Sequence, residues 1–83
     1  MNDTGIAVGA GSIASGNNVF ENETGLHVSA ASSAHNNHAT RNGVGIEVTC
    51  AVNLIGNMSV ANDDNLVTNG QGCSFFNNHI PVP

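Results

Sequence analysis

The 83-residue sequence has almost no positive charge: Arg41 is its one basic side chain apart from four histidines, and lysine is absent. Six acidic residues give a formal net charge of −5. Such a chain cannot neutralise phosphates, so we expect no nucleic-acid partner and no binding to an anionic membrane surface. No apolar run approaches the ~20 residues of a membrane-spanning helix. No basic-then-apolar segment indicates a signal peptide.

Aromatic and helix-forming residues are also scarce. Three Phe are the only aromatic residues, so a core must be aliphatic. Asn, Gly, Ser and Thr recur every few residues, and all four are poor in helix interiors. Hydrophobic residues nevertheless make up 40% of the chain and are regularly placed, which argues against a disordered polar tail. The composition favours short strands separated by turns.

What the sequence does contain is an internal repeat of 20 residues. The tetrad Gly-aliphatic-X-Val begins at Gly5, Gly25 and Gly45, and a degenerate copy begins at Asn65. Two columns of asparagines share the same period, one with Asn17, Asn37, Asn57 and Asn77 and the other with Asn22, Asn42 and Asn62. A fixed period without insertions means that equivalent residues stack on one another.

The alternation within the tetrad is typical of a half-buried strand. Because this strand is short, each coil must contain about three strands, and coils stacked ~4.8 Å apart would turn each strand into a parallel sheet. Further strands are predicted at 13–16, 54–56 and 74–76, and weaker ones at 19–20 and 59–60. The expected fold is all-β, one parallel β-helix domain over 1–83, with coils at approximately 5–24, 25–44, 45–64 and 65–83.

The stacked columns have distinct expected roles. The asparagine columns should form ladders, because an Asn amide can bond its equivalents one coil above and below. The glycine column is expected to mark a turn that needs unusual backbone angles. The core should consist of two aliphatic columns, with Ile6, Leu26, Ile46 and Leu66 in one and Val8, Val28 and Val48 in the other.

The order Gly-Ile-X-Val and then Gly-Asn-X-X-X-X-Asn, as at 16–22 and 56–62, resembles the right-handed parallel β-helix repeats of the pectate-lyase-like solenoid superfamily. The resemblance covers approximately residues 5–79. It implies a right-handed solenoid, and it brings polysaccharides in as a ligand class. The repeat motif belongs to the scaffold, so it does not by itself imply an activity.

Enzymes of that superfamily, as the resemblance implies, need clustered acids and an Arg or Lys beside the substrate carboxylate. Here the acids are spread, and the adjacent pair Asp63-Asp64 is expected to be a solvated turn rather than a calcium site. We predict no catalytic residue, no metal site and no cofactor. His35, His38 and His79 fall in different columns and are expected to be surface side chains.

Two pairs of charged or titratable residues share a column, Glu21 with Arg41 and His27 with Glu47. An exposed cross-strand pair is the simpler interpretation of His27 and Glu47, and a base with its orienting carboxylate is the other. These two are the residues that we assign to a ligand-facing surface.

Two interpretations of Cys50 and Cys73 remain open. They could bridge neighbouring coils, although nothing in the sequence requires it. The default is a small buried apolar residue at each position.

A rod of four coils is only ~19 Å long, and its end coils expose unpaired strand edges. Pro81 and Pro83 should blunt the C-terminal edge. We therefore expect the N-terminal coil to be open, and the chain to be a homo-oligomer through that coil or the tail of a longer β-helix.

These features favour a non-catalytic module that acts as an oligomeric structural or surface-interaction element. Two alternatives stay open. One is a carbohydrate-binding remnant or C-terminal part of a polysaccharide lyase, epimerase or tailspike-like protein, and the other is a self-assembling filament subunit. The Asn- and Gly-rich, lysine-free surface leans towards an exported or surface-associated setting.

Overall fold

The computed structural model describes residues 2–81 of the chain. This part of the chain is built from short strands, as expected for residues that are poor in helices. In chain order the strands are β1 (Asn2–Val8), β2 (Ile13–Ser15), β3 (Asn18–Phe20), β4 (Asn22–Val28), β5 (Ser32–His35), β6 (His38–Thr40), β7 (Val44–Thr49), β8 (Val52–Ile55), β9 (Met58–Val60), β10 (Asp64–Asn69) and β11 (Ser74–Phe76). Over residues 2–81 no helix is long and apolar enough to cross a membrane.

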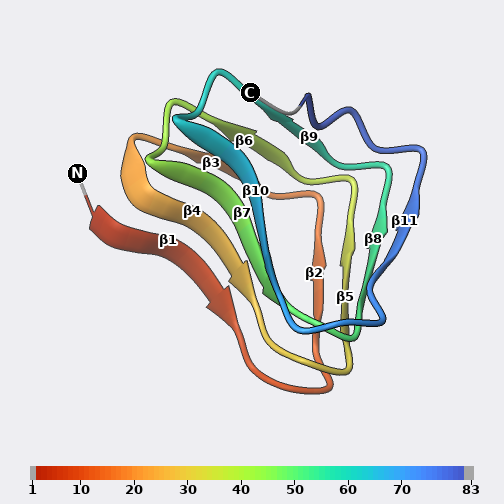
Figure 1. The fold of residues 1–83 in the computed structure, drawn as a ribbon. Coiled ribbons are helices and arrows are strands. Elements are labelled where there is room, and N and C mark those ends of the chain that lie inside the picture. The colour runs from red at the N-terminus through yellow and green to blue at the C-terminus, as the bar shows by residue number, and fades with distance from the viewer. Residues whose placement is uncertain (1, 82–83) are drawn as a thin grey trace.

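The strands form three parallel sheets, in the orders β1-β4-β7-β10, β2-β5-β8-β11 and β3-β6-β9. Figure 1 shows the chain passing from one sheet to the next and returning one coil further along, so that strands of successive coils stack. The prediction of a parallel β-solenoid of about four coils, roughly 20 residues apart, is confirmed. The right-handed sense of the winding stays a prediction of the resemblance.

The register is 20 residues in the first three coils and changes in the last one. Leu26 pairs with Ile6 on one side and Ile46 on the other, each at a separation of 20. In the second sheet, however, Leu54 pairs with Phe75, a separation of 21. The segment between β10 and β11 therefore holds one residue more than the equivalent segments, which the sequence repeat did not reveal.

The core lies inside the three sheets and is completely buried in the two middle coils. Leu26, Ile46, Val28 and Val48 have no exposed surface. The remaining members of the two predicted aliphatic columns, Ile6, Val8 and Leu66, are half-buried because they belong to the end coils. The second and third sheets add further aliphatic side chains to the core, namely Ala14, Val19, Ala34, Ala39, Val52 and Leu54.

The corners between the sheets depend on residues in the left-handed region. At the corner before the first sheet, Glu21, Arg41 and Ala61 have φ values of 61°, 54° and 58°. The corner after the second sheet uses Gly16, Asn36, Gly56 and Asn77 in the same conformation. One left-handed residue per corner turns the chain sharply, although it costs an ordinary side chain about 1 kcal/mol. Glu21 and Arg41, predicted as a charge pair, are therefore exposed corner residues.

The glycine column has a different role from the one predicted. Gly5, Gly25 and Gly45 lie inside β1, β4 and β7, and the left-handed glycines lie elsewhere. A Cβ on Gly25 would lie 2.7 Å from Gly45 O and 2.8 Å from Asn42 Nδ2. Glycine is therefore required by the close approach of the next coil and its asparagine rather than by a turn.

Candidate functional site

Two asparagine ladders line the corners of the solenoid. In the first ladder, Asn37 Oδ1 accepts hydrogen bonds from the backbone N–H and the Nδ2 of Asn17, at 3.1 and 3.0 Å. Asn37 in turn donates through the same two groups to Asn57 Oδ1, at 3.0 and 2.9 Å. Its second Nδ2 hydrogen goes to Ala14 O at 3.0 Å. An amide only 2% exposed is thus fully satisfied, which offsets the cost of burying it.

The last rung of this ladder is Asn78, and the prediction of Asn77 was wrong. Asn78 Oδ1 accepts from the backbone N–H and the Nδ2 of Asn57, at 2.8 and 3.0 Å. Asn77 is the left-handed corner residue beside it, with φ 54°. The extra residue in the last coil moves every later position along by one, so the second of two adjacent asparagines reaches the ladder.

The second ladder runs through Asn22, Asn42 and Asn62 as predicted, with rung distances of 2.8–3.2 Å. It then ends in a way that the sequence did not indicate. Asn65 Oδ1 accepts from the backbone N–H and the Nδ2 of Asn62, both at 3.1 Å, and Asn65 Nδ2 donates to Pro81 O at 2.7 Å. Asn65 occupies the place of the glycine column in the last coil and closes this ladder.

Within residues 2–81, the last coil leaves part of its core uncovered. Phe75 continues the buried column of Ala34 and Leu54, yet 52% of its surface is exposed. It lines a hollow of about 400 Å³ together with Leu66, Phe76, Asn77, Asn78 and Ile80. Pro81 does not line this hollow, and Pro83 lies outside the described residues, so within residues 2–81 the expectation that only the N-terminal coil would be open is incomplete.

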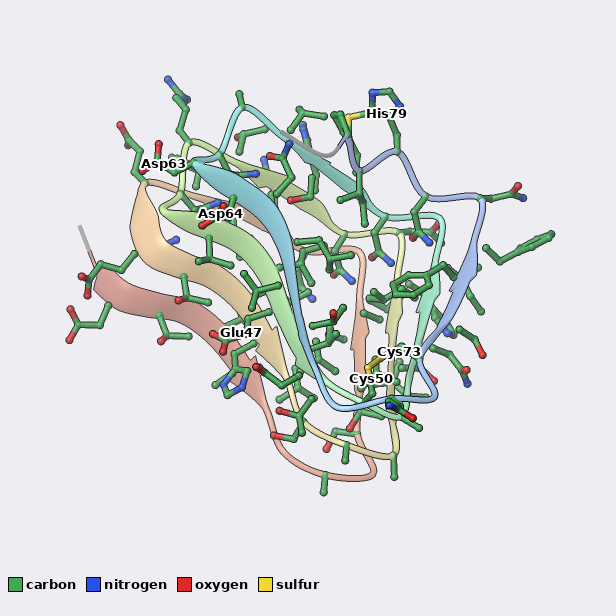
Figure 2. All side chains as sticks on the ribbon, viewed as in Figure 1. Glu47, Cys50, Asp63, Asp64, Cys73 and His79 are labelled. Carbon is green, nitrogen blue, oxygen red and sulfur yellow. A yellow bond between two sulfur atoms is a disulfide. The ribbon has the colours of Figure 1, made fainter. Side chains whose placement is uncertain are left out.

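Cys50 and Cys73 form a disulfide between the third and fourth coils, with their Cα atoms 5.0 Å apart (Figure 2). The default interpretation of two small buried thiols was wrong, and the bridging alternative holds. The bond closes a loop of 23 residues, which corresponds to about 3 kcal/mol of stabilisation in the chain-entropy model. It fixes the last coil beside the hollow.

The polar residues considered for chemistry lie apart on the outer surface. Figure 2 shows Glu47 on the outside of β7, Asp63 at the corner before β10, Asp64 at the first position of β10, and His79 near the C-terminal end. His27 and Glu47 are register partners in β4 and β7, as predicted. Glu47 Oε2 also accepts a hydrogen bond from Asn69 Nδ2 at 3.3 Å.

Among residues 2–81, no three or more His, Cys, Asp and Glu side chains form a group that could hold a metal ion. His35 in β5 is half-buried, and His38 in β6 is exposed. Of the outer residues considered for chemistry, the structure therefore brings together only His27 and Glu47 within residues 2–81, as register partners on neighbouring strands.

The fold and its ladders define a class of protein on structural grounds, a parallel β-solenoid held together by buried asparagines. Comparisons of the chain with protein-family models, with curated proteins and with solved structures found no match.

Proposed function

We propose that the chain is a non-catalytic β-solenoid module that acts as an oligomeric structural element. The observation that carries the proposal is the unfinished core of the last coil, where Phe75 points inward but is half exposed. Covering a large apolar side chain contributes about 2 kcal/mol, and an exposed apolar patch on a folded protein commonly marks an interaction site. A partner that covers this end would complete the core.

The ladders support the same function. The amides of interior rungs such as Asn37 and Asn57 direct their hydrogen bonds to neighbouring coils. They hold the rod together and have no capacity left for a ligand. The Cys50–Cys73 disulfide favours an oxidising compartment, which agrees with an exported or surface-associated setting.

The test is the mass of the disulfide-bonded chain across a hundredfold range of concentration, measured by light scattering after size exclusion. We expect a mass above that of one 8.4 kDa chain, increasing with concentration. A single-chain mass over the whole range would contradict the proposal.

We also propose that the chain is related to the pectate-lyase-like solenoids. A polysaccharide-binding module is therefore the second candidate function. The observation that favours it is the outer pair of His27 and Glu47, which are register partners on neighbouring strands, together with Asn69 of the next strand, which is bonded to Glu47. Calorimetric titration with polygalacturonate and alginate tests it. Binding that is lost in His27→Ala and kept in His35→Ala would support this candidate, and no heat with either polymer would contradict it.

A further inference from the structure

The sequence contains two Asn-Gly pairs, Asn42-Gly43 and Asn69-Gly70. An asparagine before a glycine is especially prone to deamidation, because glycine has no side chain to hinder its own backbone nitrogen when that nitrogen attacks the asparagine side chain. The attack also requires a side-chain amide that can leave its hydrogen bonds and a backbone that can rotate. The fold gives the two pairs opposite surroundings.

Asn42 is held by hydrogen bonds to neighbouring coils and to its own corner. It is a rung of the second ladder and is only 4% exposed. Its Nδ2 donates to Thr40 O and Asn62 Oδ1, both at 3.0 Å, and its Oδ1 accepts from the backbone N–H of Asn22 at 3.0 Å. The nitrogen that would attack is bonded too, since Gly43 N–H donates to Asn22 O at 2.9 Å. Deamidation at Asn42 therefore requires the ladder to open.

Asn69 lies instead on the outer side of the first sheet, where its side chain is exposed. Its Nδ2 donates to Glu47 Oε2 at 3.3 Å, which is an exposed hydrogen bond and a long one. The register partner Thr49 is exposed as well, although coils lie on both sides of it. The exposure of Asn69 therefore comes from the outward direction of this row and does not depend on its place in the last coil.

The residues that follow Asn69 allow its backbone to move. Gly70 and Gly72 have φ values of 88° and 94°, and the segment 70–72 is exposed throughout. A second hollow, of about 290 Å³, lies beside this segment. Exposed segments with few packed side chains open at low cost. Because β10 ends at Asn69, a rotation there leaves the rest of the strand in place.

We propose that Asn69-Gly70 is a self-modifying site, at which the folded chain deamidates with water as the only co-reactant. The Gly70 backbone nitrogen loses its proton to solvent and bonds to Asn69 Cγ. The Cγ–Nδ2 bond breaks, and ammonia leaves with a proton taken from solvent, so that a succinimide ring remains. Water then opens the ring at one of its two carbonyls and leaves aspartate or isoaspartate at position 69, with no change of oxidation state.

The modification changes the outer surface around Glu47, and it is independent of the oligomeric function proposed above. A carboxylate only accepts hydrogen bonds when ionised, so the bond from Asn69 to Glu47 becomes a contact between like charges. The formal net charge of −5 becomes more negative by one. His27 is the register partner of Glu47 on the other side. The surface that carries these two residues therefore changes with the age of the molecule, while the buried ladder asparagines stay intact.

The experiment incubates the disulfide-bonded chain at neutral and at mildly alkaline pH and follows deamidation with time. Anion exchange separates the chains that have gained a negative charge, and circular dichroism shows that they are folded. After reduction, cleavage on the carboxyl side of glutamate gives residues 24–47, which contain Asn42, and residues 48–83, which contain Asn69. Tandem mass spectrometry of these peptides then gives the rate at each asparagine.

We expect Asn69 to deamidate at least about tenfold faster than Asn42 in the folded chain, because Asn42 must first break buried hydrogen bonds. The rate at Asn69 should increase with pH, since the Gly70 nitrogen must lose a proton. Asn69→Gln keeps an amide at the surface but needs a larger ring for the same attack, so position 69 should stay unmodified in this variant.

The reduced chain unfolded in urea is the matched control, and there the two asparagines should react at similar rates. A folded chain in which Asn69 reacts no faster than Asn42 would overturn the proposal, whatever the rates in urea. A tenfold difference that persists in urea would overturn it too, because the neighbouring sequence rather than the fold would then select Asn69.

Discussion

At the corner between the first and second sheets, which we call the first corner, the hydroxyl of Ser32 connects the first two coils. Ser32 Oγ accepts a hydrogen bond from Ser12 N–H at 3.1 Å and donates one to Gly9 O at 2.9 Å. Two coils further along the same inward column, the residue is Cys73, and a disulfide to Cys50 makes the connection. The two ends of the solenoid thus have the same backbone arrangement but differ in the side chains that connect their coils. A hydroxyl connects the first two coils, and a disulfide connects the last two. The C-terminal end carries the covalent bond, and it is also the end with the half-exposed Phe75.

The glycine column shows the same contrast. If Gly5 in the first coil carried a Cβ, this atom would lie 2.8 Å from Gly25 O and 2.7 Å from Asn22 Nδ2. Asn65 in the last coil has a side chain at the equivalent position, and that side chain completes the second ladder. These two positions show that the next coil along the solenoid limits which side chain a position in the repeat can carry.

The largest expected effect comes from breaking this contrast with Gly45→Asn, which moves the arrangement of Asn65 one coil earlier. A Cβ on Gly45 would overlap Ser59 Oγ and collide with the Asn62 amide. We expect a loss of more than about 4 kcal/mol, enough to unfold a small domain, seen as loss of the β signal in circular dichroism. Gly9→Asn is the control, because nothing lies within 4 Å of a Cβ there. Cooperative unfolding near that of the unchanged chain would contradict this account.

Asn37→Ala should have the next largest effect, and Asn17→Ala should have a smaller one. The first removes a buried interior rung and leaves the Asn17 amide and Ala14 O without their partners, at about 1–3 kcal/mol for each group. The second removes an end rung and costs about 1 kcal/mol. Urea denaturation measures both. Equal losses would mean that rungs do not depend on neighbours on both sides.

Removing the disulfide tests whether it stabilises the last coil more than the Ser32 hydroxyl stabilises the first. The double variant Cys50→Ser and Cys73→Ser should lose about 3 kcal/mol, whereas Ser32→Ala at the other end should lose about 1 kcal/mol. Urea denaturation gives both values, and adding a reductant to the unchanged chain should reproduce the first. A disulfide variant as stable as the unchanged chain would show that packing alone holds the last coil.

The smallest effect is expected at the first corner. The residue in the left-handed region there is Gly11 in the first coil, Ala31 in the second coil and Gly72 in the last coil. Ala31 has φ 62°, so Ala31→Gly should stabilise the chain by about 0.5–1 kcal/mol. Its neighbour Ala30 lies outside the left-handed region, and Ala30→Gly should not stabilise. Thermal unfolding of the two variants decides the point, since a lower melting temperature for Ala31→Gly would contradict the assignment of strain to this corner.

The sequence predicted the solenoid, the period and most ladder positions, because stacking repeats the same residue at the same spacing. It did not predict the extra residue of the last coil, because Asn77 and Asn78 are adjacent and an asparagine therefore occupies the ladder column in either register. That single shift explains why Asn78 rather than Asn77 reaches the ladder. It also aligns Ser74 with Asn53, so that Cys73 follows Val52 in the column, whereas a strict period of 20 would align Cys73 with Asn53.

The predicted role of the glycine column was wrong, and the closing role of Asn65 was missed, for a different reason. A period cannot distinguish a glycine that needs positive φ from one that must make room for a neighbouring coil. The available signal was the residue type at the true corners, where Glu21, Arg41 and Ala61 share a column without sharing chemistry. Such a column is constrained through its backbone. Asn65 appeared only as a poor copy of the tetrad, because its partner Asn62 lies outside the strand.

Because one translation relates each coil to the next, the length of the solenoid is set by its number of coils. A duplicated middle coil, residues 22–41, would add one rung to each ladder, one strand to each sheet and ~4.8 Å to the length. It would introduce no kind of contact that the chain does not already contain. Length in this architecture is therefore counted in steps of 20 residues. A shorter insertion, like the single residue of the last coil, instead shifts the phase of every residue after it.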